Sequence, residues 1–208
     1  MYQNYIKRAF DILGASIALI ILTPVFLLLA ILIRINLGSP ILFRQQRLGY
    51  KEKIFTLYKL RTMTNQCNTD GSLLPDSERI SRFGHFLRST SMDELPELIN
   101  IIKGDMSFIG PRPLLIKYLP RYSERQRQRH KVRPGLSGLA QVKGRNTLSW
   151  DEKFNLDLQY IENISIWMDI KIFLLTILKV FKREGIHSQS SITMEEFMGS
   201  DTNTTHKL

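Results

Sequence analysis

The feature that most constrains the fold is an uncharged stretch from Ile12 to Ile33, close to the N-terminus. As a straight helix its 22 residues would extend roughly 33 Å, about the thickness of a bilayer's hydrocarbon core. A secretory signal has a shorter apolar core and a small-residue cleavage site, so we predict a membrane helix instead. Thr23-Pro24 lies in its middle, and proline removes a backbone hydrogen bond and kinks or breaks a helix.

The charges around this stretch do not decide its topology. Lys7 and Arg8 precede it, and Arg34 and a basic domain follow it. The positive-inside rule therefore gives no reason to place the two ends on opposite faces of the membrane. Two topologies stay open on the residues alone: a re-entrant helix that is broken at Thr23-Pro24 and leaves on the face where it entered, and a kinked single span.

The composition of the 208 residues favours anionic partners. Lys and Arg outnumber Asp and Glu by 29 to 19, which gives a formal charge of +10. Phosphorylated substrates, acidic lipid headgroups and nucleic acid all fit such a balance. We predict no nucleic-acid partner, because the chain carries no recognised DNA- or RNA-binding motif. The single Cys67 allows no internal disulfide and fits a reducing compartment.

The rest of the chain predicts an α+β fold that is mostly helical. Residues 41–43 and 53–58 are typical of short strands joined by a turn, and residues 79–88, 150–160 and 164–183 are typical of helices. The last helix has an apolar stripe opposite lysines, which suits an interfacial membrane helix and a helix packed on a soluble core equally. The basic run 119–133 has the pattern of a solvated helix or a lipid-contacting one. We expect a membrane helix over 1–37, a compact cytosolic domain with a β-hairpin and interfacial amphipathic helices over 38–186, and a polar, flexible tail over 187–208.

Two adjacent carboxylates, Asp93 and Glu94, stand where a helix is predicted to begin. Ser91 and Glu94 have the spacing of a capping box, and Pro96 falls in the first turn, where its missing N–H is tolerated. A helix start also holds a carboxylate in its ionised form. The pair is therefore interpreted either as helix caps or as a nucleophile and metal ligand.

Two arginines favour the second interpretation. Arg88 lies just before the acidic pair, and Arg112 lies between two prolines that restrict the backbone on both sides of it. A rigid guanidinium is a good bidentate ligand for phosphate. Carboxylates with a divalent cation, surrounded by arginines, would make a site for a phosphorylated substrate.

Four motifs follow one another in the chain: Tyr58-Lys59-Leu60-Arg61-Thr62-Met63, Asp93-Glu94-Leu95-Pro96, residues 104–113 and residues 132–146. In these motifs the chain resembles the bacterial sugar transferases, the monotopic polyprenyl-phosphate phosphoglycosyl transferases. The resemblance runs from the N-terminus to about Arg183. The order of the four motifs over more than 80 residues is far more specific than any one of them.

The resemblance implies transfer of a phosphosugar from a UDP-sugar to undecaprenyl (polyprenyl) phosphate, with release of UMP, at the cytoplasmic face of the bacterial inner membrane. Asp93 would be the nucleophile of a ping-pong reaction and would carry the phosphosugar covalently. Asp93 and Glu94 would lie at a Mg²⁺ ion, with Glu94 as its ligand or as an aid to Asp93. The resemblance also implies the re-entrant topology, and downstream glycosyltransferases as partners in glycoconjugate or exopolysaccharide assembly.

The remaining site residues are also assigned by the resemblance. Lys59, Arg88, Arg112 and Arg145 would bind phosphate oxygens, and Asp157 would contact the sugar or the metal shell. On the residues alone, Lys59 is interpreted as a solvated lysine on a strand, and the Gly-rich turn 133–138 as a phosphate cradle or a plain turn. Two other functions stay open: a membrane-tethered basic binding protein without catalysis, and a phosphohydrolase with an aspartyl-phosphate intermediate. The identity of the sugar also stays open.

Overall fold

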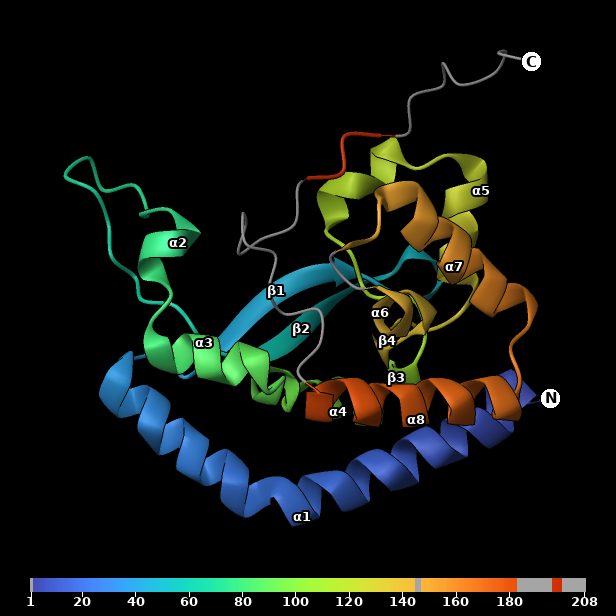
Figure 1. Cartoon of the computed structure of the whole chain (residues 1–208), viewed down its shortest axis with the longest axis horizontal. Coiled ribbons are helices and arrows are strands. Elements are labelled where there is room, and N and C mark those ends of the chain that lie inside the picture. Colours follow the sequence, from blue (N-terminus) through green and yellow to red (C-terminus); the bar gives the residue numbers. More distant parts are fainter. Residues whose placement is uncertain (1, 145–146, 183–195, 200–208) are drawn as a thin grey trace.

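The computed structural model describes residues 2–144, 147–182 and 196–199. It is mostly helical, with two small two-stranded sheets, which confirms the prediction of a mostly helical α+β fold. Figure 1 shows the long helix α1 (Lys7–Asn36) along the base of the molecule and the rest of the domain above it. One turn of π-helix, η1 (Tyr2–Ile6), precedes α1.

The helix α1 continues through Pro24, so the predicted interruption at Thr23-Pro24 is not seen. Figure 1 shows a bend in the middle of the helix instead. Thr23 Oγ1 donates a hydrogen bond to the Leu19 carbonyl oxygen at 2.7 Å, one residue before the Ile20 carbonyl that Pro24 deprives of its donor. Residues Tyr2–Asn36 form a helix that is long and apolar enough to cross a membrane.

Both arms of α1 return to the same domain. Ala15 in the first arm is fully buried against the core, and Ile33 in the second arm is fully buried in another cluster that includes Leu60 and Leu87. Between the arms, Ile20 and Ile21 are 74% and 67% exposed. The bend of α1 therefore points away from the domain and presents apolar side chains to its surroundings.

The charged residues of the first arm fasten it to the domain. Lys7 Nζ lies 2.6 Å from Asp169 Oδ2, and Arg8 donates to the Ile101 and Ile102 carbonyl oxygens at 2.6 and 2.8 Å. Asp11 Oδ1 accepts hydrogen bonds from Ser107 Oγ and the Phe108 amide, both at 3.0 Å. Lys7 and Arg8, the positive residues that precede the apolar stretch, are therefore bound to groups of the protein itself.

The predicted hairpin is confirmed and is longer than expected. Strands β1 (Leu42–Leu48) and β2 (Ile54–Leu60) pair antiparallel from Leu42↔Leu60 to Leu48↔Ile54, around the short helix η2 (Tyr50–Glu52). A second sheet was not predicted: β3 (Ser107–Ile109) and β4 (Gly135–Ser137) pair in parallel over three residues each. A Cβ atom on Gly135 would lie only 2.1 Å from the Gly110 amide nitrogen, so the crossing requires glycine.

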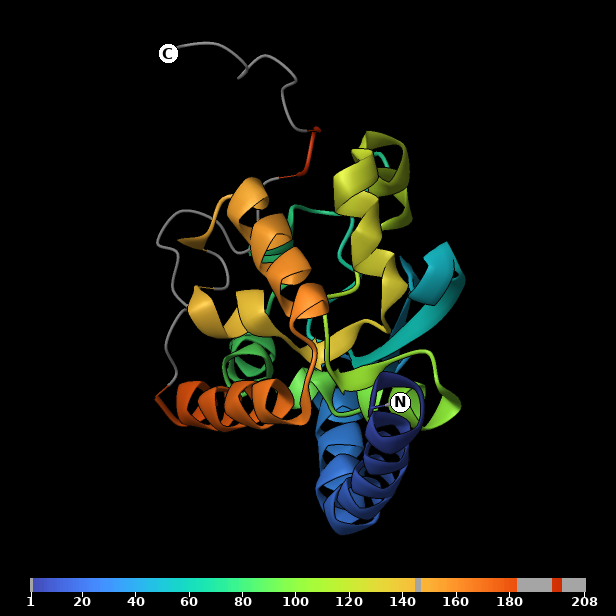
Figure 2. The same ribbon diagram turned by 90° about the vertical axis from the view of Figure 1, so that its right-hand side faces the viewer.

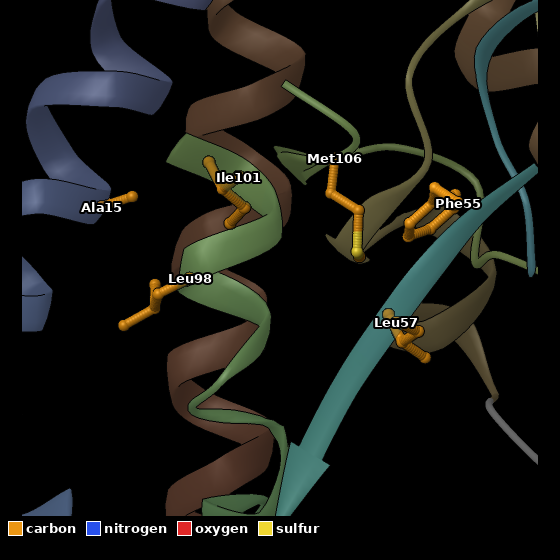
Figure 3. Close-up of a cluster of buried hydrophobic side chains, with 6 residues drawn as sticks. All are labelled: Ala15, Phe55, Leu57, Leu98, Ile101 and Met106. Carbon is orange, nitrogen blue, oxygen red and sulfur yellow. The ribbon is translucent and has the colours of Figure 1, made fainter. Parts of the chain in front are cut away.

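The core is built where α1, α4 (Glu97–Lys103) and β2 meet. Figure 3 shows Leu98 and Ile101 of α4 between Ala15 of α1 and Leu57 of β2. The buried Asn100 adds a polar link, because its side chain donates to the Thr56 carbonyl at 2.7 Å and accepts from the Tyr58 amide at 3.1 Å. The end of β2, which carries Lys59, is thereby fixed against α4.

The basic run 119–133 is not the single solvated helix that the sequence suggested. It is divided among η4 (Ile116–Arg121), α5 (Glu124–Arg127) and η5 (Gln128–Lys131). Arg129 within it is only 4% exposed, because it is paired inside the domain. Short helices that turn repeatedly allow one basic side chain to point inward while its neighbours stay in solvent.

The two predicted C-terminal helices are present as α7 (Trp150–Glu162) and α8 (Ile166–Lys182), after the short α6 (Leu139–Lys143). In Figures 1 and 2, α8 lies on the side of the domain that faces α1. Trp167 and Leu174 of its predicted stripe are 77% and 55% exposed, whereas Ile172 is fully buried. The predicted flexible tail 187–208 lies mostly outside the described residues, but its segment 196–199 packs on the domain, with Phe197 only 1% exposed.

Candidate active site

The acidic pair lies on a tight turn between two helices. Helix α3 (Arg82–Ser89) is followed by Ser91 in the left-handed conformation (φ 56°), by η3 (Met92–Glu94) and then by α4. The Ser91 side chain caps nothing, so the predicted capping box is wrong. The reason is tertiary, because the Glu94 side chain is held by cations from other parts of the chain.

Two of the predicted phosphate-binding residues meet on one oxygen of Glu94. Lys59 Nζ lies 2.6 Å and Arg112 Nη2 lies 2.8 Å from Glu94 Oε1. Burial alone would raise the pKa of Glu94, but these two cations outweigh it and hold the pKa well below its ordinary value. Glu94 is therefore ionised, and no described residue donates a hydrogen bond to its Oε2.

Asp93, its neighbour, is in the opposite situation. The residue is 8% exposed, and its carboxylate accepts no hydrogen bond from any of the described residues. Burial and the charge of Glu94 raise the pKa of Asp93 to about 6, although Lys59, Arg88 and Arg112 partly offset them. Two adjacent carboxylates thus have pKa values displaced in opposite directions, which is typical of groups with separate chemical roles.

Glu97 completes this cluster, and the sequence analysis missed it. Its Oε1 lies 3.2 Å from Lys59 Nζ, so Lys59 is shared between Glu94 and Glu97. Burial and the negative charge of Glu94 raise the pKa of Glu97 to about 7, with Lys59 opposing them. The spacing of three residues between Glu94 and Glu97 was the available signal, since it places both on one side of a helical turn.

The sequence analysis also missed Arg129, which holds two of the predicted residues, Asp157 and Arg112, in place. It donates from Nε and Nη2 to Asp157 Oδ2 at 3.0 and 2.7 Å, and from Nη2 to the Arg112 carbonyl oxygen at 2.8 Å. Asp157 is therefore held in a buried ion pair, and its contact with sugar or metal shell stays a prediction. Nothing local in the basic run distinguishes Arg129 from its exposed neighbours.

The last two predicted phosphate ligands differ in what the structure says of them. Arg88 Nε donates to Thr62 Oγ1 at 3.1 Å, and its charge acts on Asp93. Arg145 lies outside the described residues, so its predicted role is unchanged.

A cavity of about 1960 Å³ opens to the surface, and Glu97 is not part of its lining. It is lined by the other described site residues: Lys59, Arg88, Asp93, Glu94, Arg112, Arg129 and Asp157. It extends from Arg34 and Ile41, beside the second end of α1, past Asp93 to Trp150 and Phe154 on α7. Among the described residues, its lining has ten Lys or Arg side chains and four Asp or Glu: Arg34, Arg44, Arg47, Lys59, Arg61, Arg79, Arg88, Arg112, Arg129 and Lys153, against Asp76, Asp93, Glu94 and Asp157. A cavity with this excess of cations suits polyanionic ligands.

The sequence model of the bacterial sugar transferases matches residues 2–183. The chain belongs to the bacterial sugar transferase family. It is 49% identical, over 94% of its length, to the uncharacterized sugar transferase EpsL of Bacillus subtilis, of which it covers 96%. It is 38% identical to the UDP-glucose:undecaprenyl-phosphate glucose-1-phosphate transferase of Escherichia coli and 35% identical to the undecaprenyl-phosphate galactose phosphotransferase of Salmonella typhimurium. Each of these two alignments takes in 89% of this chain but 42% of the relative.

In this sugar transferase, the glycines of the turn 133–138 serve the backbone. The Gly135 amide donates to the Pro111 carbonyl at 3.0 Å and the Gly110 amide donates to the Ser137 carbonyl at 2.8 Å. The Ser137 hydroxyl lies 2.6 Å from the Thr176 hydroxyl of α8. These groups join β3, β4 and α8, so the phosphate-cradle interpretation has no support from them.

The acidic turn of the transferase has oxygen donors that suit Mg²⁺. This ion is usually held by one or two carboxylates, with substrate phosphates and water as its other ligands. The carboxylate of Asp93 and the Oε2 atom of Glu94, which accept no hydrogen bond from the described residues, fit that requirement. Within the described part of the chain, no three His, Cys, Asp or Glu side chains form a metal-binding group.

Proposed function

We propose that this protein transfers a sugar 1-phosphate from a UDP-sugar to undecaprenyl phosphate and releases UMP. The observation that carries the proposal is the contrast within the acidic turn. The buried Asp93 accepts no hydrogen bond from the described residues, whereas two cations hold its neighbour Glu94 in place. The printed activities of the Escherichia coli and Salmonella relatives support the same reaction class. The basic cavity supplies the charge that two phosphorylated substrates need.

The reaction has two displacements. A carboxylate oxygen of Asp93 attacks the β-phosphorus, the bond from that phosphorus to the bridging oxygen breaks, and UMP leaves with the electron pair. A phosphate oxygen of undecaprenyl phosphate then attacks the acyl phosphate, and the Asp93 carboxylate is released. Covalent catalysis of this kind divides a difficult reaction between two polyanions into two easier steps.

In the proposal, the remaining site residues stabilise the negative charge of the phosphates during these two steps. Lys59 and Arg112 keep Glu94 ionised and lie beside the reacting phosphates, and Arg88 and Arg145 add positive charge for their oxygens. Mg²⁺ held by Asp93 and Glu94 would neutralise phosphate charge when it is bound. Asp157 keeps Arg129 on the backbone of Arg112, and we retain its contact with the sugar as part of the proposal.

The membrane arrangement follows from the two arms of α1. Because both arms pack on one domain, we propose that the helix enters and leaves the bilayer on the same face, the cytoplasmic face of the inner membrane. The exposed apolar face of α8 would then lie at the interface, and the Arg34 end of the cavity would receive the lipid phosphate. Downstream glycosyltransferases would use the lipid-linked product.

The direct test is the mass of the protein during turnover. Protein incubated with a panel of UDP-sugars, without lipid acceptor, is expected to gain the mass of one sugar phosphate at Asp93 and to release one equivalent of UMP. Asp93→Asn should show neither. Continued turnover to free sugar 1-phosphate, beyond one equivalent of UMP, without added undecaprenyl phosphate would indicate a phosphohydrolase. No UMP release with any donor would favour a binding protein.

Topology is tested by labelling in intact cells. The lone Cys67 is exposed on the domain, so it reports the side on which the domain lies. Asn4→Cys in a Cys67→Ser background reports the N-terminus, where Asn4 is exposed. We expect an impermeant maleimide to label neither site until the membrane is opened. Labelling of position 4 alone from outside would contradict the re-entrant helix.

A further inference from the structure

A short C-terminal segment, Glu196–Gly199, packs on the domain beyond residues 2–183, the part that the family model matches. Figure 1 shows it on the side of the domain opposite α1, next to the chain between β3 and α5. Phe197 is 1% exposed, whereas the next residue, Met198, is 74% exposed. One side chain of this segment is thus inserted while its neighbour stays in solvent.

Phe197 enters a cluster of aromatic rings. Its ring centroid lies 5.0 Å from that of Phe154, 5.3 Å from that of Trp150 and 5.8 Å from that of Tyr118. With Phe154 and Tyr118 the geometry is edge-to-face, which is a favoured arrangement of aromatic pairs. The contact is therefore specific packing against α7 and η4.

Glu196 fixes the segment from the other side. Its Oε2 lies 2.5 Å from Lys117 Nζ and its Oε1 lies 2.7 Å from Arg121 Nη1. Arg121 also donates to the Phe197 carbonyl oxygen. The segment therefore combines one buried aromatic anchor with a carboxylate held by two cations of η4.

The rings that receive Phe197 also form a wall of the active-site cavity. Tyr118, Trp150 and Phe154 line that cavity together with Asp93 and Glu94, and Phe197 packs against all three. Removal of Phe197 would leave these rings without one of their supports. The α7 end of the cavity would then lose its fixed shape.

A chain of contacts continues from this wall to the acidic turn. The Arg129 guanidinium lies 5.7 Å from the centre of the Phe154 ring and donates to the Arg112 carbonyl oxygen at 2.8 Å. Arg112 in turn donates to Glu94 Oε1 at 2.8 Å. The backbone of Arg112 is thus held by a residue that rests on the ring supported by Phe197.

We propose that Glu196 and Phe197 form a C-terminal clamp that positions the α7 wall and Arg112 for the soluble donor substrate. Phe197 touches no reacting atom, so it is a positioning residue, and its effect on the donor rests on the proposed function. The described contacts of Glu196 and Phe197 go to η4, Tyr122 and α7, and not to the end of the cavity near Arg34. Binding of the donor should therefore depend on the clamp, and binding of the lipid phosphate should not.

The test uses the full-length protein with Phe197→Ala, with Phe197→Leu as the conservative rescue and Met198→Ala as the matched control. We expect Phe197→Ala to raise KM for the UDP-sugar about five- to twentyfold and to leave KM for undecaprenyl phosphate unchanged. Phe197→Leu should recover most of the loss, and Met198→Ala should behave as the wild type. Equal rises for both substrates, or a lower melting temperature with both KM values unchanged, would overturn the proposal.

Two further measurements make the clamp testable without turnover. The chain has two tryptophans, so Trp167→Phe leaves Trp150 as the sole reporter. In that background, Phe197→Ala should shift Trp150 emission to the red and increase its quenching by acrylamide. Glu196→Lys should do the same, and Lys117→Glu should restore the wild-type spectrum in the double variant. Unchanged emission in both single variants would refute the clamp, whatever the fate of the proposed reaction.

Discussion

This transferase has two clusters of buried charged residues that are similar in composition. They differ in how many of their carboxylates are hydrogen-bonded by the described residues. At the foot of α1, Asp169 accepts hydrogen bonds from Tyr2, Lys7 and Tyr160, at 2.6, 2.6 and 2.7 Å. At the acidic turn, Lys59 and Arg112 both bind Glu94 Oε1, whereas Asp93 has no hydrogen-bond donor among the described residues. A closed cluster of buried charges joins elements, whereas an open one keeps a group available for chemistry at a cost in stability.

We expect the largest effect on the open cluster from the removal of Lys59, the cation that Glu94 and Glu97 share. Lys59→Met leaves Glu94 and Glu97 buried with one partner fewer, and should lower the free energy of unfolding by about 3–5 kcal/mol. Loss of transition-state charge stabilisation should also lower kcat/KM by about a hundredfold or more. Denaturant titration in detergent and UMP release measure the two effects. Lys59→Arg is the matched control, and an active, stable Lys59→Met would contradict the assignment.

Breaking the closed cluster should affect stability alone. Asp169→Asn leaves Lys7 buried without its counter-charge, which should destabilise the protein by about 3–5 kcal/mol. The acidic turn does not contact Asp169, so kcat measured well below the melting temperature should stay within about twofold of the wild type. A double variant with Lys7→Met should recover part of the stability. A large fall in kcat with normal melting would show that the two clusters are coupled.

The open cluster should become more stable when Asp93 is neutralised. The pKa of Asp93 is about 6 in the folded protein, against an ordinary value of 3.8. The folded state therefore disfavours the ionised form, and Asp93→Asn should raise the free energy of unfolding by about 2–3 kcal/mol at pH 8. The gain should be absent near pH 3 and should grow between pH 4 and 6. Unfolding curves in EDTA test this, with Glu162→Gln at the exposed end of α7 as control.

The smallest expected effect is on the pH profile of the wild type. Because Asp93 must be ionised to attack phosphorus, the first half-reaction should slow by about tenfold per pH unit below the pKa of Asp93 and level off above it. That pKa is about 6 in the metal-free protein, and Mg²⁺ bound to the carboxylate would shift the break to lower pH. Burst release of UMP from a single turnover isolates this step. A rate that stays constant down to pH 4.5 would mean that Asp93 is ionised much more easily than its surroundings imply.

From the sequence alone, most residues of the candidate site could be predicted, but not which of them form ion pairs with one another. Asp93, Glu94, Lys59, Arg88 and Arg112 were all predicted, and the structure brings them to one cavity. Glu97 and Arg129 were missed because their roles depend on partners that are distant in sequence. Arg129, for example, is separated from Asp157 by 28 residues and looks like any other member of a basic run.

The elements of the fold also fall into those that the sequence predicts and those that it does not. The apolar helix, the hairpin and the two C-terminal helices follow from local periodicity and turn residues, which the sequence displays directly. The β3–β4 pair, with three residues in each strand, has no local signal, because it depends on a close crossing at Gly110 and Gly135. The capping box failed for a similar reason, since distant cations compete for the Glu94 side chain.

The sequence by itself determined a long N-terminal apolar helix, a basic domain and an acidic pair among family motifs. Only the tertiary structure decided that both arms of α1 pack on one domain and that Glu94 is the paired acid and Asp93 the open one. The physical reason is that both outcomes depend on groups far apart along the chain. Lys59 and Arg112 lie 35 and 18 residues from Glu94, and they meet only after β2, α4 and the segment beyond β3 have packed together.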